Sequence, residues 1–365
     1  MKHARKTVGL LFGGCSAEHD VSRMSAANIL RALDPAKYDI VPIGIARNGR
    51  WRLGNSAAPG SKSLEIPQDA PEVALLPGHD GELAVLGEEP RRLRLDVAVP
   101  VLHGPNGEDG TVQGLLELAN LAYVGSGVMG SAACMDKDVA KRLLRDGGLP
   151  VVPFLSMTRR TRMSYEAATG MLGTSDLFVK PANMGSSVGV SPARSAATFE
   201  AACDLAFRHD AKILVERSVS GAREIECSIL EGASGELRAS PLGEIAPAKS
   251  HGFYSYAAKY EDAAGADLLI PADLDPALAD RIRELALEAF RVLGCEGLAR
   301  VDFFVDPADP DGIYVNEINT LPGFTAISMY PKLWEAAGLS QRELMDVLIG
   351  HALARQDGRR APKPA

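Results

Sequence analysis

Three oxygen-bearing side chains near the C-terminal end of the sequence have a spacing that suits a metal site. Glu317 and Asn319 are two residues apart, so in a strand both side chains project from the same face. Asp302 lies in the preceding apolar segment, residues 299–306, which a short connection allows to pair antiparallel with the strand of Glu317. Oxygen donors without His or Cys suit a hard cation such as Mg²⁺ or Mn²⁺. Spacing alone leaves a solvated polar sheet face as an equal alternative, and the unusual Gly/Pro-bearing turn at 320–325 favours the metal site.

A lysine followed by a Gly/Ser-rich loop could hold phosphate. Lys180 ends a predicted strand at 177–180, and the loop 181–189 follows directly. Glycines let backbone N–H groups approach phosphate oxygens, and serine hydroxyls add donors. A flexible surface loop is the alternative from the sequence alone, and Lys137 is a second candidate lysine. The loop is not of the Walker type, because no G-x-x-x-x-G-K-[ST] sequence occurs in the chain.

The segment 125–130 matches G-x-G-x-x-G, but it does not indicate a nicotinamide site. That pattern is informative when it closes the first strand of a dinucleotide-binding unit and an acidic residue follows about 20 positions on. Here that position falls at the Gly/Pro break 147–150. We therefore discount a nicotinamide-dependent dehydrogenase.

The order of apolar segments predicts an α/β protein. Residues 7–12 and 38–46 read as strands and 17–33 as a helix, which indicates a parallel sheet with covering helices. A further buried strand is predicted at 96–102, and the Pro-, Gly- and charge-rich stretch 54–92 is predicted to form hairpins and loops.

The rest of the chain divides into two further predicted units and a tail. The predicted elements are a helix at 137–145, strands at 177–180, 213–216 and 224–230, a helix at 276–293, and strands at 299–306 and 313–319. The predicted boundaries are 1–125 for the N-terminal domain, 126–216 for a central unit, 217–355 for a C-terminal unit and 356–365 for a frayed tail.

Composition excludes several classes of protein. The chain has 365 residues and a net charge of −8, which argues against a broad nucleic-acid surface. No apolar run reaches the roughly 18 residues that a membrane span needs. Residues 1–6 are basic, but a predicted strand follows without a signal-peptide cleavage site, so we expect a cytoplasmic location. The cysteines have no metal-ligand spacing and are expected to be small buried residues: Cys15, Cys134, Cys203, Cys227 and Cys295.

Taken together and in this order, several motifs resemble the ATP-grasp superfamily and, within it, the D-alanine–D-alanine ligases. The motifs span most of the chain: residues 13–22 (GGCSAEHDVS), 103–114 (HGPNGEDGTVQG), 135–137 (MDK), the Lys180 loop, 223–226 (REIE), 259–260 (KY), 300–302 (RVD) and 316–325 (NEINTLPGFT). The resemblance implies an N-terminal α/β domain packed against a two-part ATP-grasp fold, with the nucleotide between the two parts.

The resemblance also assigns ligands. It implies ATP contacts from Lys137, Lys180, Ser187, Glu216, Glu224, Lys259, Asn316 and Glu317. It implies that Asp302, Glu317 and Asn319 hold magnesium, as two ions, in agreement with the spacing argument. Two D-alanine molecules are the implied substrates, and a homodimer is the implied assembly.

For the substrates, the resemblance implies that Glu18 holds the ammonium of the first D-alanine and that Ser186 and Tyr260 are its partners. His103, Ser328 and Met329 complete the implied substrate site, with Ser328 binding the second carboxylate. We expect Arg300 and the backbone N–H of Gly323 to stabilise an oxyanion. The residues alone leave alternatives open: Glu18 as an ordinary helix-terminus carboxylate, His103 as a core histidine and Tyr260 as a packing aromatic.

The segment 247–265 contains aromatics and glycines with few regular signals, and we expect it to be a lid that carries Lys259 and Tyr260. Two rivals remain. The first is another ligase of the same superfamily, including the D-alanine–D-lactate type, which is disfavoured because the resemblance places a tyrosine such as Tyr260 in dipeptide-forming enzymes. A non-catalytic nucleotide sensor is disfavoured because it need not keep Arg300 together with the metal carboxylates.

Overall fold

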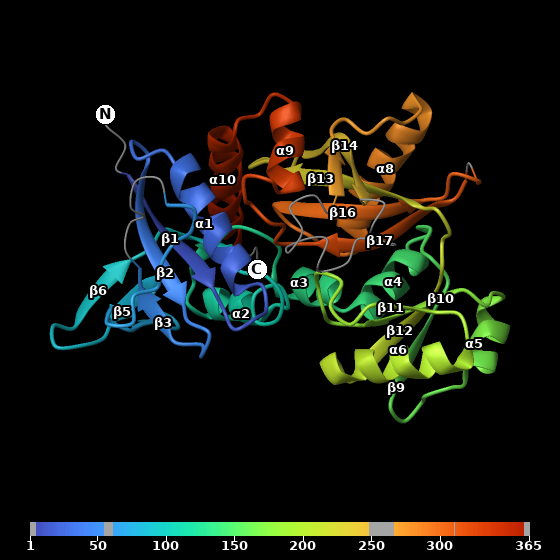
Figure 1. Ribbon diagram of the computed structural model, residues 1–365. Coiled ribbons are helices and arrows are strands. Elements are labelled where there is room, and N and C mark those ends of the chain that lie inside the picture. The colour runs from blue at the N-terminus through green and yellow to red at the C-terminus, as the bar shows by residue number, and fades with distance from the viewer. Residues whose placement is uncertain (1–4, 55–60, 248–265, 310, 361–365) are drawn as a thin grey trace, which may run out of the picture.

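The computed structural model describes residues 5–54, 61–247, 266–309 and 311–360. Its strands form four sheets, and Figure 1 shows them in three regions of the molecule. The N-terminal region (blue to teal) lies on one side, the C-terminal sheet (orange) on the other, and the central region (green) below the latter. The predicted α/β class is confirmed.

The N-terminal sheet has the strand order β3-β2-β1-β7-β8. Strands β1, β2, β7 and β8 pair in parallel, and only β3 is antiparallel to its neighbour. Helix α1 packs on β1, because every second side chain of β1 and the buried side chains of α1 belong to the same apolar core. The elements are β1 (Lys6–Gly13), α1 (His19–Ala32), β2 (Tyr38–Ile45), β3 (Trp51–Leu53), β7 (Val97–Val101), α2 (Thr111–Leu118) and β8 (Ala122–Tyr123).

The stretch predicted as hairpins and loops contains a small antiparallel sheet, β4-β5-β6. Its strands are β4 (Val73–Leu75), β5 (Glu82–Val85) and β6 (Arg91–Arg94). The prediction of hairpins is therefore confirmed. Its apolar side chains join the core on the face of the N-terminal sheet opposite α1, where α2 also packs.

The central region is a four-stranded sheet, β11-β10-β12-β9, with α5 and α6 against one face. The opposite face is turned toward the C-terminal sheet, as Figure 1 shows. The elements are α3 (Val128–Met135), α4 (Lys137–Asp146), β9 (Phe154–Thr158), α5 (Tyr165–Leu172), β10 (Leu177–Pro181), β11 (Ser191–Ala193), α6 (Ala196–His209) and β12 (Lys212–Arg217).

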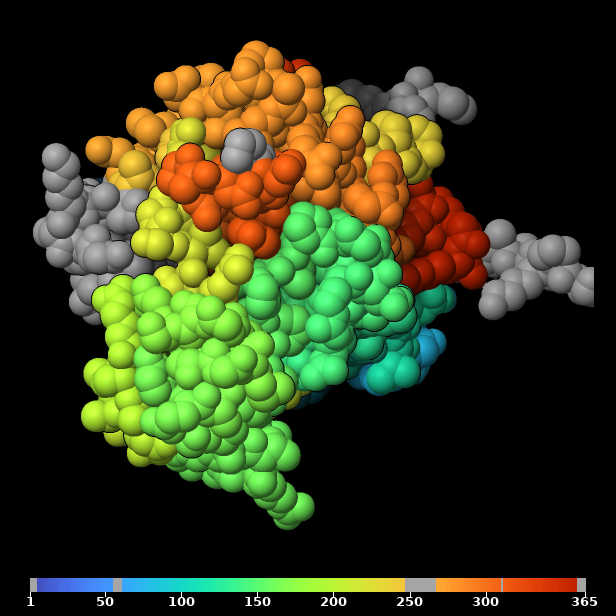
Figure 2. All heavy atoms as spheres, turned by 90° about the vertical axis from the view of Figure 1, so that its right-hand side faces the viewer, coloured from blue at the N-terminus to red at the C-terminus, as the bar shows by residue number. Residues whose placement is uncertain are grey.

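The C-terminal sheet is antiparallel, with the order β15-β14-β13-β16-β17. In β16, Val301, Phe303 and Val305 are buried against α8, while the residues between them face the other side. This alternation confirms the predicted two faces of the strand. The elements are β13 (Arg223–Glu231), β14 (Leu237–Pro247), β15 (Ala266–Leu269), α8 (Pro276–Val292), β16 (Leu298–Val305), β17 (Ile313–Asn319), α9 (Met329–Ala336) and α10 (Gln341–Arg360). Figure 2 shows the side on which the central unit (green) lies below the C-terminal unit (orange).

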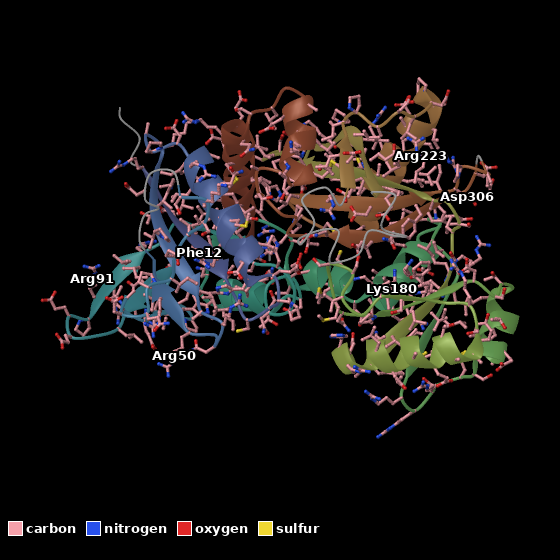
Figure 3. All side chains as sticks on the ribbon, viewed as in Figure 1. Phe12, Arg50, Arg91, Lys180, Arg223 and Asp306 are labelled. Carbon is pink, nitrogen blue, oxygen red and sulfur yellow. The ribbon has the colours of Figure 1, made fainter. Side chains whose placement is uncertain are left out.

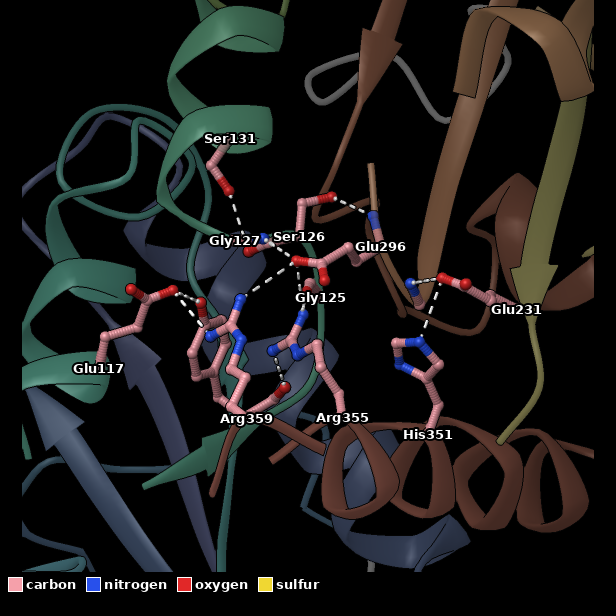
Figure 4. A network of polar contacts seen from close by, with 12 residues as sticks. Glu117, Gly125, Ser126, Gly127, Ser131, Glu231, Glu296, His351, Arg355 and Arg359 are labelled. Carbon is pink, nitrogen blue, oxygen red and sulfur yellow. Dashed lines mark hydrogen bonds and ion pairs between the residues drawn. The ribbon is translucent and has the colours of Figure 1, made fainter. Parts of the chain in front are cut away.

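The prediction of a frayed tail from residue 356 is wrong for residues 356–360, which continue α10. Arg355 and Arg359 explain why the helix persists. Arg355 donates to the carbonyls of Tyr123 and Gly125 at 2.7 and 2.6 Å, and Arg359 lies 3.0 Å from Glu117. Figure 4 shows that these contacts also include Glu296 of the C-terminal region, so α10 joins the two regions.

The cysteine prediction is partly wrong. Cys15 is exposed, whereas the other four thiols are buried. The Sγ atoms of Cys134 and Cys295 lie 3.5 Å apart, which is contact between free thiols and not a disulfide. Within the described ranges, no helix has the length and apolar character that a membrane crossing requires.

Candidate active site

A cavity of about 430 Å³ lies between the central and C-terminal sheets, lined by residues of β10, β12, β13, β16 and β17 and the loop after β10. Figure 3 shows Lys180 on the central unit where it faces the C-terminal sheet. Eight residues predicted to bind nucleotide or metal line this cavity: Lys137, Lys180, Ser187, Glu216, Glu224, Asp302, Asn316 and Glu317. Lys259 and Tyr260 lie outside the described residues.

The predicted antiparallel pairing of the two acidic strands is confirmed, and it makes Asp302 and Glu317 direct cross-strand partners. The register then shifts, because Phe303 pairs with Val315. The residue left over is Asn316, a bulge that places both Asn316 and Glu317 at the cavity. Strict alternation from Glu317 would have turned Asn316 toward the apolar core.

Two lysines share one buried glutamate at the cavity floor. Lys180 Nζ lies 2.8 Å from Oε2 of Glu216 and 3.3 Å from Oδ1 of Asn316. Lys141, only 1% exposed, places its Nζ 3.0 Å from Oε1 of the same glutamate. The cluster of Lys141, Lys180 and Glu216 thus carries one surplus positive charge, which suits an anion such as phosphate.

These charges shift pKa values in opposite directions. Burial lowers the pKa of Lys141 to about 8, although Glu216 opposes the shift. Burial by itself would raise the pKa of Glu216, but Lys141 and Lys180 hold it below its ordinary value. Sequence reasoning missed Lys141. The available signal was its position four residues after Lys137, on the same face of α4.

Lys137 joins three segments at the cavity. Its Nζ donates to the carbonyl of Met184 at 2.8 Å and lies 3.3 Å from Oε2 of Glu317. It is the first residue of α4, whose N-cap Asp136 accepts from the first-turn backbone N–H groups and pairs with Lys212 at 2.7 Å. The cap fixes the first residue of α4 and therefore the backbone position from which the Lys137 side chain extends into the cavity.

Arg300 grips Asp302 with two parallel bonds. Its Nε and Nη2 donate to the two carboxylate oxygens of Asp302, both at 2.7 Å. Nε also lies 3.0 Å from Oε2 of Glu226, a residue of β13 that pairs directly with Asp302 and that sequence reasoning missed. Burial opposes the charge on Arg300, but Asp302 and Glu226 raise its pKa well above the ordinary value. The guanidinium is therefore charged and fixed in orientation.

A second set of predicted residues meets where the N-terminal region reaches the loop after β10. Ser186 donates its hydroxyl to Oε1 of Glu18 at 2.5 Å. Side-chain carbons built at Gly104 or Gly185 would each lie 3.4 Å from Oε2 of Glu18. The Glu18 carboxylate is therefore enclosed by backbone from two loops, with room left by the glycines.

His103 is buried beside this carboxylate. Its Nδ1 lies 3.1 Å from the Leu321 carbonyl, which can only accept, so Nδ1 carries the proton. Burial lowers the pKa of His103, so the ring is neutral and Nε2 is an acceptor with no partner in the described part of the chain. Glu108, which sequence reasoning missed, accepts from the Gly104 N–H at 2.6 Å. Burial and the charge of Glu18 raise the pKa of Glu108 to about 8.

The turn after β17 brings Gly323 and Ser328 together. A side-chain carbon at Gly323 would lie 2.8 Å from the Ser328 Oγ, which itself accepts from the Thr325 N–H at 3.0 Å. Met329 is 3% exposed and packs with Ile245 and Leu333, so its side chain faces the core. Asn319 Oδ1 accepts from the Leu321 N–H at 3.2 Å and does not line the cavity.

The comparisons agree with this geometry. Family models for the N-terminus and the C-terminus of D-ala D-ala ligase match residues 7–126 and 143–350. A D-alanine–D-alanine ligase of Bradyrhizobium sp. strain BTAi1 is 62% identical over 359 residues, 97% of each chain. The structure of the D-alanine–D-alanine ligase from Coxiella burnetii superposes with a TM-score of 0.83 at 37% identity, covering 98% of this chain and 96% of that one. The VanG D-Ala:D-Ser ligase from Enterococcus faecalis has a TM-score of 0.81 at 34% identity, with coverages of 96% and 100%.

An N-terminal domain with parallel strands followed by two sheets that enclose a charged cavity defines an ATP-grasp protein. The matches cover nearly the whole chain and agree with one another. The chain belongs to the D-alanine–D-alanine ligase family.

Proposed function

We propose that this protein joins two D-alanine molecules into D-alanyl-D-alanine, converting ATP into ADP and phosphate, to supply peptidoglycan synthesis. The observation that carries the proposal is the bond between Ser186 and Glu18. It ties the loop beside the nucleotide cavity to a carboxylate that suits an amino-acid ammonium. A nucleotide site and an amino-acid site therefore share one loop.

The chemistry requires activation, because a carboxylate has a poor leaving group and does not react with an amine at neutral pH. We assign the first step to transfer of the ATP γ-phosphoryl group to the first D-alanine, which gives an acyl phosphate. Phosphoryl transfer depends on positioning and charge neutralisation. Lys137 lies at the cavity, and the cluster of Lys141, Lys180 and Glu216 contributes its one surplus positive charge there.

Asp302 and Glu317 fit a hard divalent cation, because they are oxygen donors that lie directly opposite each other on β16 and β17. Each carboxylate oxygen has more than one acceptor position, so Arg300 and a metal can share Asp302. Asn319 would join them through the acceptor position of its Oδ1 that the Leu321 N–H leaves open, and together these residues would hold Mg²⁺ or Mn²⁺, as two ions. The metal would neutralise phosphate charge during the transfer.

In the second step, the amine of the second D-alanine attacks the acyl phosphate and an oxyanion develops. We assign its stabilisation to Arg300, through the Nη1 donors that Asp302 and Glu226 leave over, and to the Gly323 N–H. Loss of one such donor typically slows a reaction by about 100- to 1000-fold. Glu18 would bind the first ammonium, neutral His103 would accept a hydrogen bond from substrate, and Ser328 with the start of α9 would bind the second carboxylate.

Further parts of the proposal concern the whole protein. We assign the divisions 1–125, 126–216 and 217–355 to its three domains, a homodimer to its assembly and the cytoplasm, where ATP is made, to its location. We assign Lys259 and Tyr260, which lie outside the described residues, to a lid. Protection of residues 247–265 from proteolysis by ATP and D-alanine together would support the lid, and equal cleavage with and without them would contradict it.

The function is tested by phosphate release from ATP with D-alanine, L-alanine, or D-alanine plus D-lactate, and by mass spectrometry of the products. We expect release with D-alanine, with D-alanyl-D-alanine as the product. A preference for D-lactate would identify an ester-forming enzyme. ATP binding without turnover would identify a nucleotide sensor, and either result would refute the proposal.

A further inference from the structure

The turn that carries Gly323 is held by helix α1 of the N-terminal region. The Phe324 N–H donates to the Ser25 hydroxyl at 3.1 Å, and the Phe324 carbonyl accepts from Nδ2 of Asn28 at 2.9 Å. Ser25 and Asn28 are three residues apart and therefore lie on one face of α1. Both backbone polar groups of one turn residue are thus satisfied by side chains about 300 positions earlier in the chain.

The other end of the turn is also fastened. There the Leu321 carbonyl accepts from His103 Nδ1 at 3.1 Å. At the Phe324 end, the ring of Phe324 also packs on Tyr330, with ring centres 5.4 Å apart. Between these two anchors, the Gly323 N–H donates to no acceptor in the described part of the chain. The turn is therefore rigid at both ends and presents one unused donor in the middle.

We propose that Ser25, with Asn28, is a positioning residue that aims the Gly323 N–H at the oxyanion of the ligation step. The inference rests on the proposed function, because it concerns the same oxyanion. A preorganised donor works only if its direction is fixed before the charge develops. The Ser25 hydroxyl fixes the peptide plane that follows Gly323, and His103 fixes the Leu321–Pro322 plane, so the Pro322–Gly323 plane that carries the N–H is held from both sides.

Removal of the Ser25 hydroxyl cannot be compensated locally. Ser25 is fully buried, so water does not replace the lost acceptor, and the Phe324 N–H would be left unsatisfied unless the turn moves. A shift of about 1 Å in a catalytic group can cost roughly 100-fold in rate. Asn28 also donates to Oε1 of Gln341 at 2.7 Å, so its loss affects α10 as well. Ser25 is therefore the cleaner residue to change.

Comparing the rates of the two chemical steps distinguishes a loss of positioning from a loss of stability. The oxyanion forms only when the amine attacks, so a misdirected Gly323 N–H slows ligation without slowing acyl phosphate formation. Reversible acyl phosphate formation is measured as positional exchange of ¹⁸O in labelled ATP in the presence of D-alanine. A general loss of structure would lower the exchange and the ligation together.

The experiment compares Ser25→Ala with the wild-type full-length enzyme and with Ser240→Ala. Ser240 is a matched control, because it is also fully buried and its hydroxyl accepts from the Ser228 N–H at 3.0 Å. For Ser25→Ala we expect turnover to fall by roughly 10- to 100-fold, with the KM for ATP and the isotope exchange changed by less than about threefold. For Ser240→Ala we expect a lower Tm with near-normal turnover.

Asn28→Asp provides a second variant, in which the shape is kept but an oxygen replaces the donor to the Phe324 carbonyl. As in Ser25→Ala, the rate of ligation should fall while the rate of isotope exchange stays nearly constant, so the ratio of exchange to ligation should rise. Normal turnover in Ser25→Ala, or a parallel fall of exchange and ligation in both variants, would overturn the inference and leave the proposed function intact. Absence of D-alanyl-D-alanine from the wild-type reaction would overturn both.

Discussion

The hydroxyl of Ser186 lies 2.5 Å from Oε1 of Glu18, although the two residues are 168 positions apart. Ser186 has a φ of 53°, in the left-handed region that serine rarely adopts. The surrounding loop therefore stores strain to direct this hydroxyl, which is a common feature of functional sites. A substrate bound to Glu18 would therefore be linked, through the Ser186 hydrogen bond, to the loop beside the nucleotide cavity.

Ser186→Ala is expected to lower kcat/KM for D-alanine by roughly 10- to 100-fold, because a hydrogen bond to a charged group contributes about 1.5–3 kcal/mol. Steady-state kinetics at saturating ATP measures the effect. Ser195→Ala is the control: it removes the N-cap of α6 in the same unit and should lower Tm without changing kcat/KM. Equal kcat/KM for Ser186→Ala and the wild type would exclude a role for the Ser186–Glu18 bond.

Arg300→Lys should reduce kcat by about 100-fold or more even though the positive charge is kept. Lysine cannot form the two parallel bonds that fix Arg300 on Asp302, and its single ammonium cannot also reach the oxyanion. Arg223→Lys is a matched control, because Arg223 makes the same forked contact with Glu244, at 2.9 and 2.6 Å, outside the cavity lining. The control should lose stability and keep most of its turnover. Comparable turnover in Arg300→Lys and Arg223→Lys would argue against the oxyanion role.

Lys141→Met should raise the KM for ATP by roughly 10-fold, because it removes the surplus positive charge behind Glu216. In the wild type, ATP affinity should weaken as the pH rises through about 8, where Lys141 gives up its proton. The variant should lack this dependence, as calorimetric titration between pH 6.5 and 9.5 would show. The control is Arg142→Met, because Arg142 is the next residue of α4 and is half exposed. This variant should keep the wild-type dependence of ATP affinity on pH. Superimposable profiles for Lys141→Met and the wild type would rule out this role.

Glu108 is expected to make stability fall as pH rises. Its pKa is about 8 in the folded protein and near 4.5 in the unfolded chain, so the folded state binds more protons between these values. The penalty is absent below about pH 4.5, grows through neutral pH and is complete above about pH 8. Glu108→Gln removes it, so the variant should gain Tm relative to the wild type between pH 6 and 9. Thermal unfolding across this range measures the gain, with the exposed Glu89→Gln expected to follow the wild-type curve. A constant Tm difference at all pH values would contradict the assignment.

The sequence by itself determined the local elements of the site. Alternation of polar and apolar residues in 299–306 and 313–319 predicted two faces, the short connection between the segments predicted an antiparallel pair, and the structure pairs Asp302 with Glu317. The predicted parallel order of strands around 7–12 is likewise confirmed in β1, β2 and β7. The faces are predictable because side-chain direction in a strand has a period of two. The strand directions are predictable because a short connection permits antiparallel pairing, whereas parallel strands need a longer crossover such as a helix.

Tertiary structure alone decided which distant groups meet. Three examples are the bulge at Asn316, the glutamate shared by Lys141 and Lys180, and the hydrogen bond between Ser25 and Phe324. Each joins separate segments of the chain, and no residue pattern in the sequence predicts these contacts. The pKa values of Lys141 and Glu108 follow from burial among particular charges, which no spacing rule encodes. Register, burial and long-range contact are properties of the packed chain, because they depend on how whole elements fill space against one another.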